Sequence, residues 1–432
     1  MKIITAPVIF LSFSRPPVID GALLLEDGTI KAAGPRRDIL SSVSMNSVEK
    51  VEELEETAIM PGLVNCHCHL ELSGAESVRQ EIAFGRGFTS WVRSIMAVKE
   101  RLISEEGARA QMLQMARRGI LTVSDHGNTR LIPQLTARLF SSGAFLPRLV
   151  FMNEIIHPEA GVPEIDPPPG GEGPEGLHAF SLAAHSPYLC SPEAMVFLKQ
   201  WCRRLNTPFS IHTAESRDEI MFLTERTGPL KALLEERGRL PLPYRLPRTT
   251  SVRLLDHLGL LDEGTICVHC VHVDGQEMEL LASSGASVCL CPESNRLMDV
   301  GTAPADRLLK AGVNLCIGTD SLASNSRLDI FREMASLSAS HPSIPPESIL
   351  QAATSGGARA LGMTGVLGEI GPGRRAWFLA VSPVPKRLDE VCEFLVKEAC
   401  RPQSCSTAVH TPGGWLAPAA GKHRGVAQEE KA

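Results

Sequence analysis

Apolar and polar positions change their pattern near residue 58. Residues 1–57 carry short apolar runs separated by Asp-Gly turn signals, for example at 19–25 and 28–34, which is typical of antiparallel strands. Beyond residue 58, apolar runs alternate with amphipathic segments of helical period, and this predicts parallel βα units. The expected strands are 62–69, 120–125, 147–153, 178–184, 208–212, 265–271, 286–290 and 313–319, and the expected helices include 90–118, 193–204, 275–284, 303–311 and 328–338.

Eight such strands predict an α/β fold with a closed (β/α)8 TIM-like barrel. An open doubly wound sheet is the alternative, but no glycine-rich phosphate loop follows the first expected strand. After a helix at 347–361 the chain returns to turns and strands. We therefore predict three parts: a small β-sandwich domain from residues 1–57 and 363–415, a barrel over 58–362, and a flexible tail at 416–432. The Pro/Gly-rich stretch 158–176 is expected to be a mobile surface loop.

Composition narrows the class of protein. The 432 residues are 43% hydrophobic and 21% charged, with a net charge of −6, which is ordinary for a globular enzyme and offers no basic surface for nucleic acid. Twelve Cys lack the regular spacing of a secreted disulfide framework, and no apolar run approaches the roughly 20 residues of a membrane span. The apolar stretch 3–13 is interrupted by polar residues and is expected to be a first strand. A cytoplasmic protein without membrane or nucleic-acid partners is predicted.

The candidate chemistry begins with Pro61-Gly62-Leu63-Val64-Asn65-Cys66-His67-Cys68-His69. Alternate residues of a strand point to the same side, so His67 and His69 present two imidazoles to one point, while Cys66 and Cys68 face away. Two imidazoles make half of a zinc site, which a third His and a carboxylate would complete. Further His and Asp residues occur where later barrel strands are expected to end, and a barrel gathers strand ends at one mouth.

The chain resembles the amidohydrolase superfamily, in the branch of nucleoside and purine deaminases and triazine chlorohydrolases. The flanking small β-domain also matches, so the resemblance covers nearly the whole chain. The matching motifs run in order between residues 61 and 321: Pro61-Gly62-Leu63-Val64-Asn65-x-His67-x-His69, His185-Ser186-Pro187-Tyr188, His212-Thr213-Ala214-Glu215, His269-Cys270-Val271-His272, Cys291-Pro292-Glu293-Ser294-Asn295 and Gly318-Thr319-Asp320-Ser321.

The resemblance implies roles for these residues. One divalent metal, zinc in the first place and iron(II) as the alternative, would be held by His67, His69, His212 and Asp320. Glu215 would carry a proton to a ring nitrogen, and Asp320 would also accept the proton of the attacking water. His269 would orient that water, and His185 would contact the substrate. Relatives with two metals carry a Lys at the end of the fourth strand. Residues 181–185 contain none, so a single metal is expected.

The substrate is less constrained. His69-Leu70-Glu71-Leu72-Ser73, with Gly87-Phe88-Thr89-Ser90-Trp91-Val92, resembles the aminofutalosine deaminases of menaquinone biosynthesis. Glu71 is either a ligand of a ribose hydroxyl or a salt-bridged loop residue, and Trp91 either stacks on the substrate or packs in the core. Deamination of 6-amino-6-deoxyfutalosine is the first hypothesis. The alternatives are deamination of methylthioadenosine, S-adenosylhomocysteine or guanine, chloride removal from a triazine, and a non-catalytic barrel that retains its metal. The partner is a small molecule, and the superfamily often forms homodimers.

Other polar residues near these motifs have structural interpretations. Asp125 and His126 end an expected strand and are interpreted as support for the metal ligands. His272 is interpreted as structural, and the CxxC pair Cys267 and Cys270 as buried core.

Overall fold

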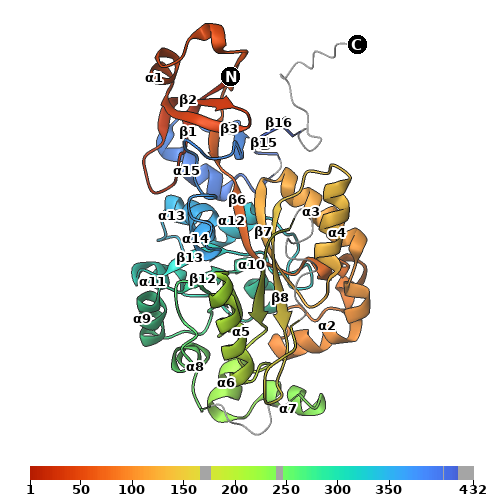
Figure 1. Ribbon diagram of the computed structural model, residues 1–432. Coiled ribbons are helices and arrows are strands. Elements are labelled where there is room, and N and C mark those ends of the chain that lie inside the picture. Colours follow the sequence, from red (N-terminus) through yellow and green to blue (C-terminus); the bar gives the residue numbers. More distant parts are fainter. Residues whose placement is uncertain (166–176, 240–246, 402, 417–432) are drawn as a thin grey trace.

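The computed structural model describes residues 1–165, 177–239, 247–401 and 403–416. Two sheets of eight strands organise these residues, one wholly parallel and the other largely antiparallel. They lie end to end, with the parallel sheet and its helices forming the larger body (Figure 1). The predicted fold class, a barrel with a small β-domain from both chain ends, is confirmed. Most of the loop expected at 158–176, and nearly all of the tail expected at 416–432, fall outside the described residues.

The parallel sheet follows chain order from first to last strand. Its members are β6 (Leu63–Cys68), β7 (Ile120–Gly127), β8 (Arg148–Ile155), β9 (Leu177–Ala184), β10 (Phe209–Thr213), β11 (Thr265–His269), β12 (Ser287–Leu290) and β13 (Asn314–Ile317). The first and last strands meet just beyond β13, where the amides of Thr319 and Asp320 both donate to the carbonyl of His67, at 2.9 and 3.0 Å. The sheet therefore closes on itself at the carboxyl ends of its strands.

Helices cover the outside of the barrel (Figure 1). They are α2 (Phe88–Leu102), α3 (Glu105–Arg117), α4 (Leu131–Ser141), α5 (Pro192–Leu205), α6 (Arg217–Glu225), α7 (Pro229–Glu236), α8 (Ser251–His257), α9 (Gly275–Ser284), α10 (Pro292–Met298), α11 (Ala305–Lys310), α12 (Ile330–Ser340), α13 (Pro346–Gln351) and α14 (Gly357–Ala360), with a π-helical turn at Ala352–Gly356. Short 3-10 helices lie at Leu70–Leu72 and Ala75–Glu81.

The single helix expected over 90–118 is wrong, because the chain forms two helices there. Ser104 separates α2 from α3: its backbone is extended, and its hydroxyl accepts a hydrogen bond from the amide of Gly107. Such a cap satisfies a free amide at the start of a helix and fixes its beginning. The expected helix 275–284 matches α9, which begins with a reciprocal capping box between Asp274 and Glu277.

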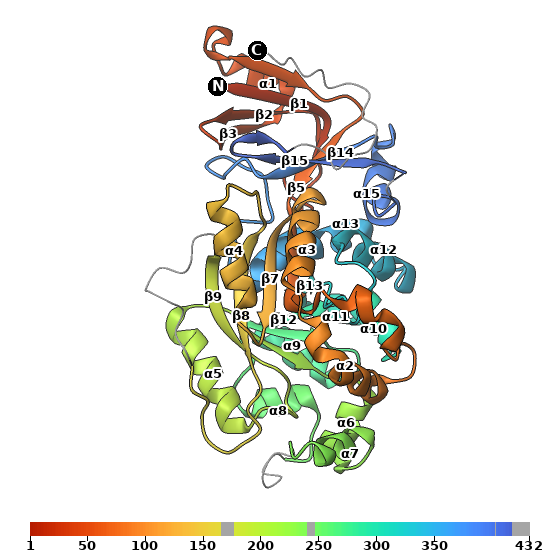
Figure 2. The same cartoon turned by 90° about the vertical axis from the view of Figure 1, so that its right-hand side faces the viewer.

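The second sheet joins both chain ends. Its strands are β1 (Lys2–Ile9), β2 (Val18–Glu26), β3 (Thr29–Pro35), β4 (Lys50–Glu53), β5 (Ala58–Pro61), β14 (Phe378–Ser382), β15 (Ser406–Thr411) and β16 (Gly414–Trp415), with α1 (Arg36–Ser41), a 3-10 turn at Met45–Ser47 and α15 (Leu388–Lys397) beside them. The first half of β1 pairs with β4 and its second half with β5, while β5 also pairs with β14. Figure 2 shows these N- and C-terminal strands side by side above the barrel.

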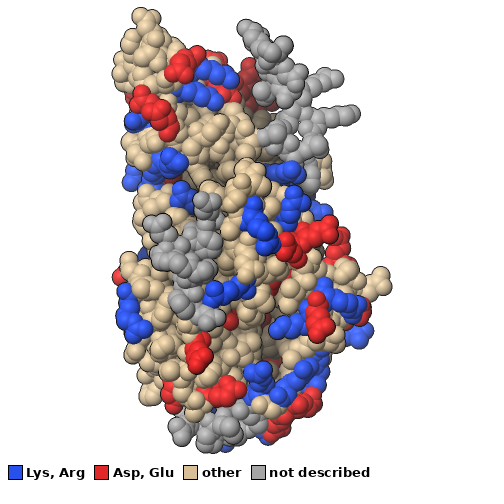
Figure 3. Space-filling model, turned by 45° about the vertical axis from the view of Figure 1, so that its right-hand side comes forward, with Lys and Arg blue, Asp and Glu red and all other residues tan. Residues whose placement is uncertain are grey.

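The barrel interior is apolar below the mouth, where alternate residues of neighbouring strands pack together. The apolar side chains that fill the interior are at most 1% exposed and include Val64, Cys66, Met152, Val268 and Cys289. On the face in Figure 3, acidic and basic side chains are interspersed, so no extended basic surface is seen there. Among the described residues, no helix combines the length and the apolar character that crossing a membrane requires.

Candidate active site

His67 and His69 lie at the carboxyl end of β6. His67 is fully buried, and neither ring nitrogen has a hydrogen-bond partner among the described residues. His69 donates its Nδ1 proton to the carbonyl of His126 at 2.7 Å, which leaves its Nε2 as an electron-pair donor. The two rings are 4.8 Å apart between centroids. As the alternation along the strand predicts, both imidazoles point into the same space.

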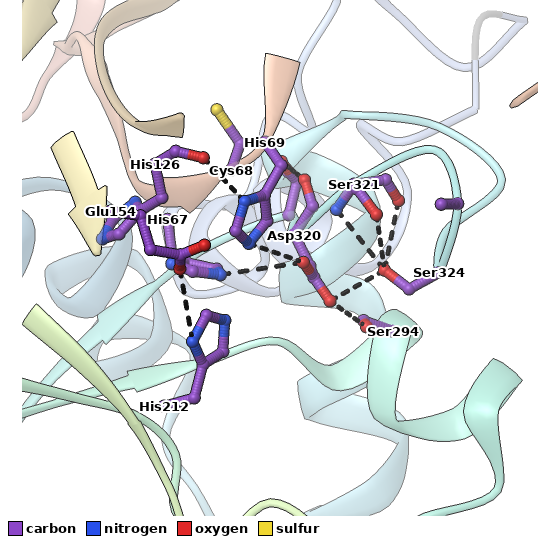
Figure 4. A network of polar contacts seen from close by, with 12 residues as sticks. His67, Cys68, His69, His126, Glu154, His212, Ser294, Asp320, Ser321 and Ser324 are labelled. Atoms are coloured by element: carbon purple, nitrogen blue, oxygen red, sulfur yellow. Dashed lines mark hydrogen bonds and ion pairs between the residues drawn. The ribbon is translucent and has the colours of Figure 1, made fainter. Parts of the chain in front are cut away.

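His212 ends β10 on the other side of the mouth. Its Nδ1 donates to the carbonyl of His185 at 2.6 Å, so its Nε2 is also left as a donor of electrons. One ring nitrogen from each of His67, His69 and His212 lies within 4.8 Å of the others. Figure 4 shows these imidazoles converging, those of His67 and His69 from the end of β6 and that of His212 from β10.

Asp320 completes the group from the loop after β13. Its Oδ1 lies 3.7 Å from His67 Nε2 and 3.6 Å from His69 Nε2. Its Oδ2 accepts hydrogen bonds from the hydroxyls of Ser294 and Ser324, at 2.6 and 2.7 Å. These two bonds fix the carboxylate with one oxygen directed at the imidazoles (Figure 4).

Gly318 allows this close approach of the barrel ends. A Cβ at this position would lie 2.7 Å from His67 Cβ and 2.8 Å from the His67 carbonyl oxygen. Backbone atoms at that distance cannot give way, so a side chain would push the loop of Asp320 away from β6. The Gly-Thr-Asp motif therefore has a steric reason for its first residue.

The charge states of these groups suit a bound divalent cation. Burial lowers the pKa of His67 to about 3, and burial likewise lowers the pKa of His212 well below its ordinary value. Burial would raise the pKa of Asp320, but the neighbouring imidazoles of His67 and His69 hold it well below the usual range. Two neutral imidazoles, a third with a free nitrogen and a carboxylate are a donor set that zinc accepts. The unpartnered nitrogens of His67 are the observation that fits a metal here.

Glu215 and His269 lie beside the metal-ligating group. His269 donates its Nδ1 proton to Asn295 Oδ1 at 2.9 Å, and its Nε2 is buried, 3.5 Å from Glu215 Oε1. Burial, with the nearby charges of Asp320 and Glu219, raises the pKa of Glu215 well above its ordinary value. A carboxyl group that holds its proton at neutral pH can act as a general acid. Asn295, whose role the sequence leaves open, supports His269.

A cavity of about 400 Å³ opens over these groups. His69, His212, Glu215 and Asp320 form part of its floor, and His185 lines it as well. Trp91 is in the wall, with its indole N–H bound to the carbonyl of Ala323 at 3.0 Å. The structure thus brings together the predicted metal ligands, the predicted acid and the predicted substrate contact His185.

Glu71 is placed differently from the rest. Its Oε1 accepts from the amide of Asn128 at 3.1 Å, and its Oε2 accepts from the amide and hydroxyl of Thr129, at 3.1 and 2.6 Å. These bonds hold the loop after β7, and Glu71 is not among the residues that line the cavity. The prediction that Glu71 binds substrate therefore rests on the sequence alone.

The remaining candidates have structural contacts. Asp125 Oδ1 accepts from the amide of Leu70 at 2.7 Å, and the ring of His126 packs 4.3 Å from that of His67. His272 bonds the carbonyl of Val300 at 2.9 Å. Cys267 and Cys270 are fully buried.

The sequence-based analysis missed several residues of the cavity wall, namely Lys99, Asn128, Glu154, Arg237 and Arg239. Glu154 had a usable signal, because it directly follows the expected strand 147–153 and barrels place reactive groups at strand ends. Lys99 and the two arginines had none, since they lie on α2 and just beyond α7.

Comparisons with known proteins agree with this geometry. The model of the amidohydrolase family matches residues 58–409. A 5-methylthioadenosine/S-adenosylhomocysteine deaminase of Nitratidesulfovibrio vulgaris is 31% identical over 378 residues, covering 83% of this chain and 78% of its own. Zinc-bound adenosine deaminase from Xanthomonas campestris superposes with a TM-score of 0.73 at 25% identity, over 96% and 92% of the two chains. Helicobacter pylori aminofutalosine deaminase, in complex with methylthio-coformycin, gives a TM-score of 0.80 at 18% identity, over 96% and 100%.

Proposed function

Since this chain belongs to the amidohydrolase family and is a metal-dependent hydrolase of C–N bonds, we propose that it deaminates the adenine ring of a 5′-substituted adenosine, with 6-amino-6-deoxyfutalosine as the first candidate. The observation that carries the proposal is the juxtaposition of a buried Glu215, whose pKa is raised well above its ordinary value, with the convergent imidazoles and Asp320 on one cavity floor. This arrangement combines an acid for a ring nitrogen with a place for an attacking water.

The residues divide the reaction between them. His67, His69, His212 and Asp320 would hold one divalent cation, zinc in the first place, which supplies the Lewis acidity that activates water at neutral pH. Glu215 donates its proton to N1 of the ring, which makes C6 more electrophilic. Asp320 accepts one proton from the water that adds at C6 and passes it to the amino group. His269 directs its Nε2 toward that water, ammonia leaves as the ring carbonyl forms, and the proton of the C6 hydroxyl restores Glu215.

The cavity wall supports a substrate with an apolar arm and an anionic end. Leu72, Ile95, Met96, Ile156 and Leu234 line the wall, and Met96 and Ile156 are each 37% exposed. Lys99, Arg237 and Arg239 line the same cavity, all three are exposed, and within the described part of the chain no ion pair engages them. Aminodeoxyfutalosine carries a benzoate at its 5′ end, which would place a ring on the apolar wall and a carboxylate near the cations.

A second candidate is a methylthioadenosine/S-adenosylhomocysteine deaminase. It is favoured by the relatives of that name, which are 26–31% identical over more than 80% of this chain. S-adenosylhomocysteine ends in a carboxylate beside an ammonium group, so its 5′ end has no net charge, and methylthioadenosine and adenosine are neutral there. The cations therefore favour aminodeoxyfutalosine, whose 5′ end is a net anion, over the other three nucleosides.

The test is ammonia release from a matched panel. Purified protein with one equivalent of zinc is assayed on aminodeoxyfutalosine, S-adenosylhomocysteine, methylthioadenosine, adenosine and guanine. The highest kcat/KM is expected on aminodeoxyfutalosine. A highest value on either of the next two substrates would favour the second candidate, and release from guanine alone would contradict both. No ammonia from any of them would leave a binding protein as the better interpretation.

A further inference from the structure

Two buried polar atoms in the cavity wall have no hydrogen-bond partner among the described residues and no part in the chemistry just described. They are Glu154 Oε1, at the end of β8, and His185 Nδ1, directly after β9. Glu154 is only 4% exposed, yet its side chain lines the cavity, as does that of His185. Leaving a buried carboxylate oxygen without a donor is costly, so its retention points to a ligand that supplies one.

The surroundings of Glu154 leave this oxygen unsatisfied. Its Oε2 accepts from Asn128 Nδ2 at 3.1 Å, which orients the carboxylate. Its Oε1 lies 3.6 Å from His212 Nδ1, but that nitrogen already donates to the His185 carbonyl at 2.6 Å. Figure 4 shows the Glu154 carboxylate beside His67, with one oxygen facing His212. No described residue provides Oε1 with a hydrogen bond.

The spacing of these side chains fits two neighbouring hydroxyl groups. One ligand atom from each of Glu154, His185 and His212, a ring nitrogen or a carboxylate oxygen, lies within 4.8 Å of the others. Vicinal hydroxyls offer two O–H donors from adjacent carbons, and a carboxylate oxygen and an imidazole nitrogen can each accept one. A second cation is a poorer fit, because the Nδ1 of His212 is protonated and engaged, which leaves only two protein ligands.

We propose that Glu154, together with His185, binds the 2′- and 3′-hydroxyls of the substrate sugar and makes the site selective for ribonucleosides. Glu154 Oε1 accepts from one hydroxyl and His185 Nδ1 from the other. This assignment rests on the proposed function, since it requires a nucleoside in the cavity. It gives Glu154 the contact with the sugar that the sequence suggests for Glu71.

The experiment combines replacement of the Glu154 side chain with removal of one hydroxyl group from the substrate sugar. The best nucleoside of the panel and its 2′-deoxy and 3′-deoxy counterparts are assayed with the wild-type protein, Glu154→Ala and Glu154→Gln, and zinc is counted in each. The control is Glu159→Gln, which removes an exposed carboxylate five residues further along the same connection. For the wild type, removing a hydroxyl is expected to lower kcat/KM by about 10- to 100-fold, as for a hydrogen bond to a charged group.

In Glu154→Ala the ribonucleoside is expected to lose a similar factor, and the deoxy counterpart to lose little more. Glu154→Gln, which keeps an acceptor oxygen, should recover part of the discrimination. Equal losses on ribo and deoxy substrates would overturn the proposal, because Glu154 would then act only through His212. A second zinc in the wild type that Glu154→Ala loses would overturn it in favour of a cation site. If the wild type deaminates no nucleoside at all, the proposed function fails, and this assignment fails with it.

Discussion

The floor and the wall of the cavity are built by different parts of the fold. The floor takes its side chains from strand ends: His69 from the end of β6, His212 from β10 and Asp320 from beyond β13. The wall takes Trp91 and Lys99 from α2 and further residues from α7 and the segment after it. Strand ends in a barrel hold side chains at fixed positions, whereas helices and loops vary freely around them. We therefore expect the floor to set the reaction and the wall to set the choice of substrate.

The largest effect is expected from removing a ligand on the floor. His67→Ala should lose bound zinc and lower kcat/KM by at least about 10³-fold, since even the groups that support metal ligands contribute about 10- to 100-fold. Metal analysis and deamination rates check this. His272→Ala is the matched control, because His272 bonds the carbonyl of Val300 and lies outside the metal-ligating group. Full zinc content in His67→Ala would contradict the assignment of ligands.

Glu215→Gln should retain zinc but lower kcat by about 10²-fold or more, because an amide cannot donate the proton that the ring nitrogen needs. Rates and metal content are measured on the same samples. Glu225→Gln, an exposed change at the end of α6, should behave as the wild type. Normal turnover by Glu215→Gln would contradict the assignment of Glu215 as the acid on the cavity floor, and with it the proposed division of roles between floor and wall.

The hydroxyls that orient Asp320 should have a smaller effect. Ser294→Ala combined with Ser324→Ala is expected to weaken zinc binding by about 10- to 100-fold, because the carboxylate loses both hydrogen bonds that hold it. Competition with a chelator gives the dissociation constant. Ser340→Ala, at an exposed hydroxyl whose hydrogen bonds lie at the end of α12 and away from the metal-ligating group, should leave zinc binding unchanged.

Charge changes in the wall should have the smallest effect and should depend on the substrate. Lys99→Ala and Arg237→Ala are each expected to raise KM about 2- to 5-fold for nucleosides with an anionic 5′ end, the size of an exposed ion pair. Neutral nucleosides should be unaffected, and added salt should reduce the difference. Arg204→Ala, an exposed cation outside the cavity lining, is the control. Equal changes on neutral and anionic substrates would mean that the wall does not discriminate by charge.

The sequence predicted the floor well and the wall poorly, for physical reasons. Alternation along a strand is enough to place His67 and His69 on one side, and strand ends converge in any closed barrel. By contrast, the wall depends on where α2 ends at Leu102 and on α7, a helix of only eight residues that was not expected although Leu230, Leu233 and Leu234 follow helical spacing. Glu71 shows that nearness in sequence to a metal ligand does not by itself place a side chain in the site. It lies two residues after His69, yet its carboxylate accepts hydrogen bonds from the loop at Asn128 and Thr129.

The closure of the barrel has a consequence for how the molecule matures. Asn65 and Thr319, which are 254 residues apart, bond each other through side chain and backbone at the junction where β6 meets the end of β13. His67 and Asp320 flank that junction, so a metal ion bound by both residues would link the first strand of the barrel to the end of the last. Bringing such remote segments together is entropically expensive. Metal binding and barrel closure should then be one cooperative event. The metal-free protein should unfold first where β6 meets the end of β13.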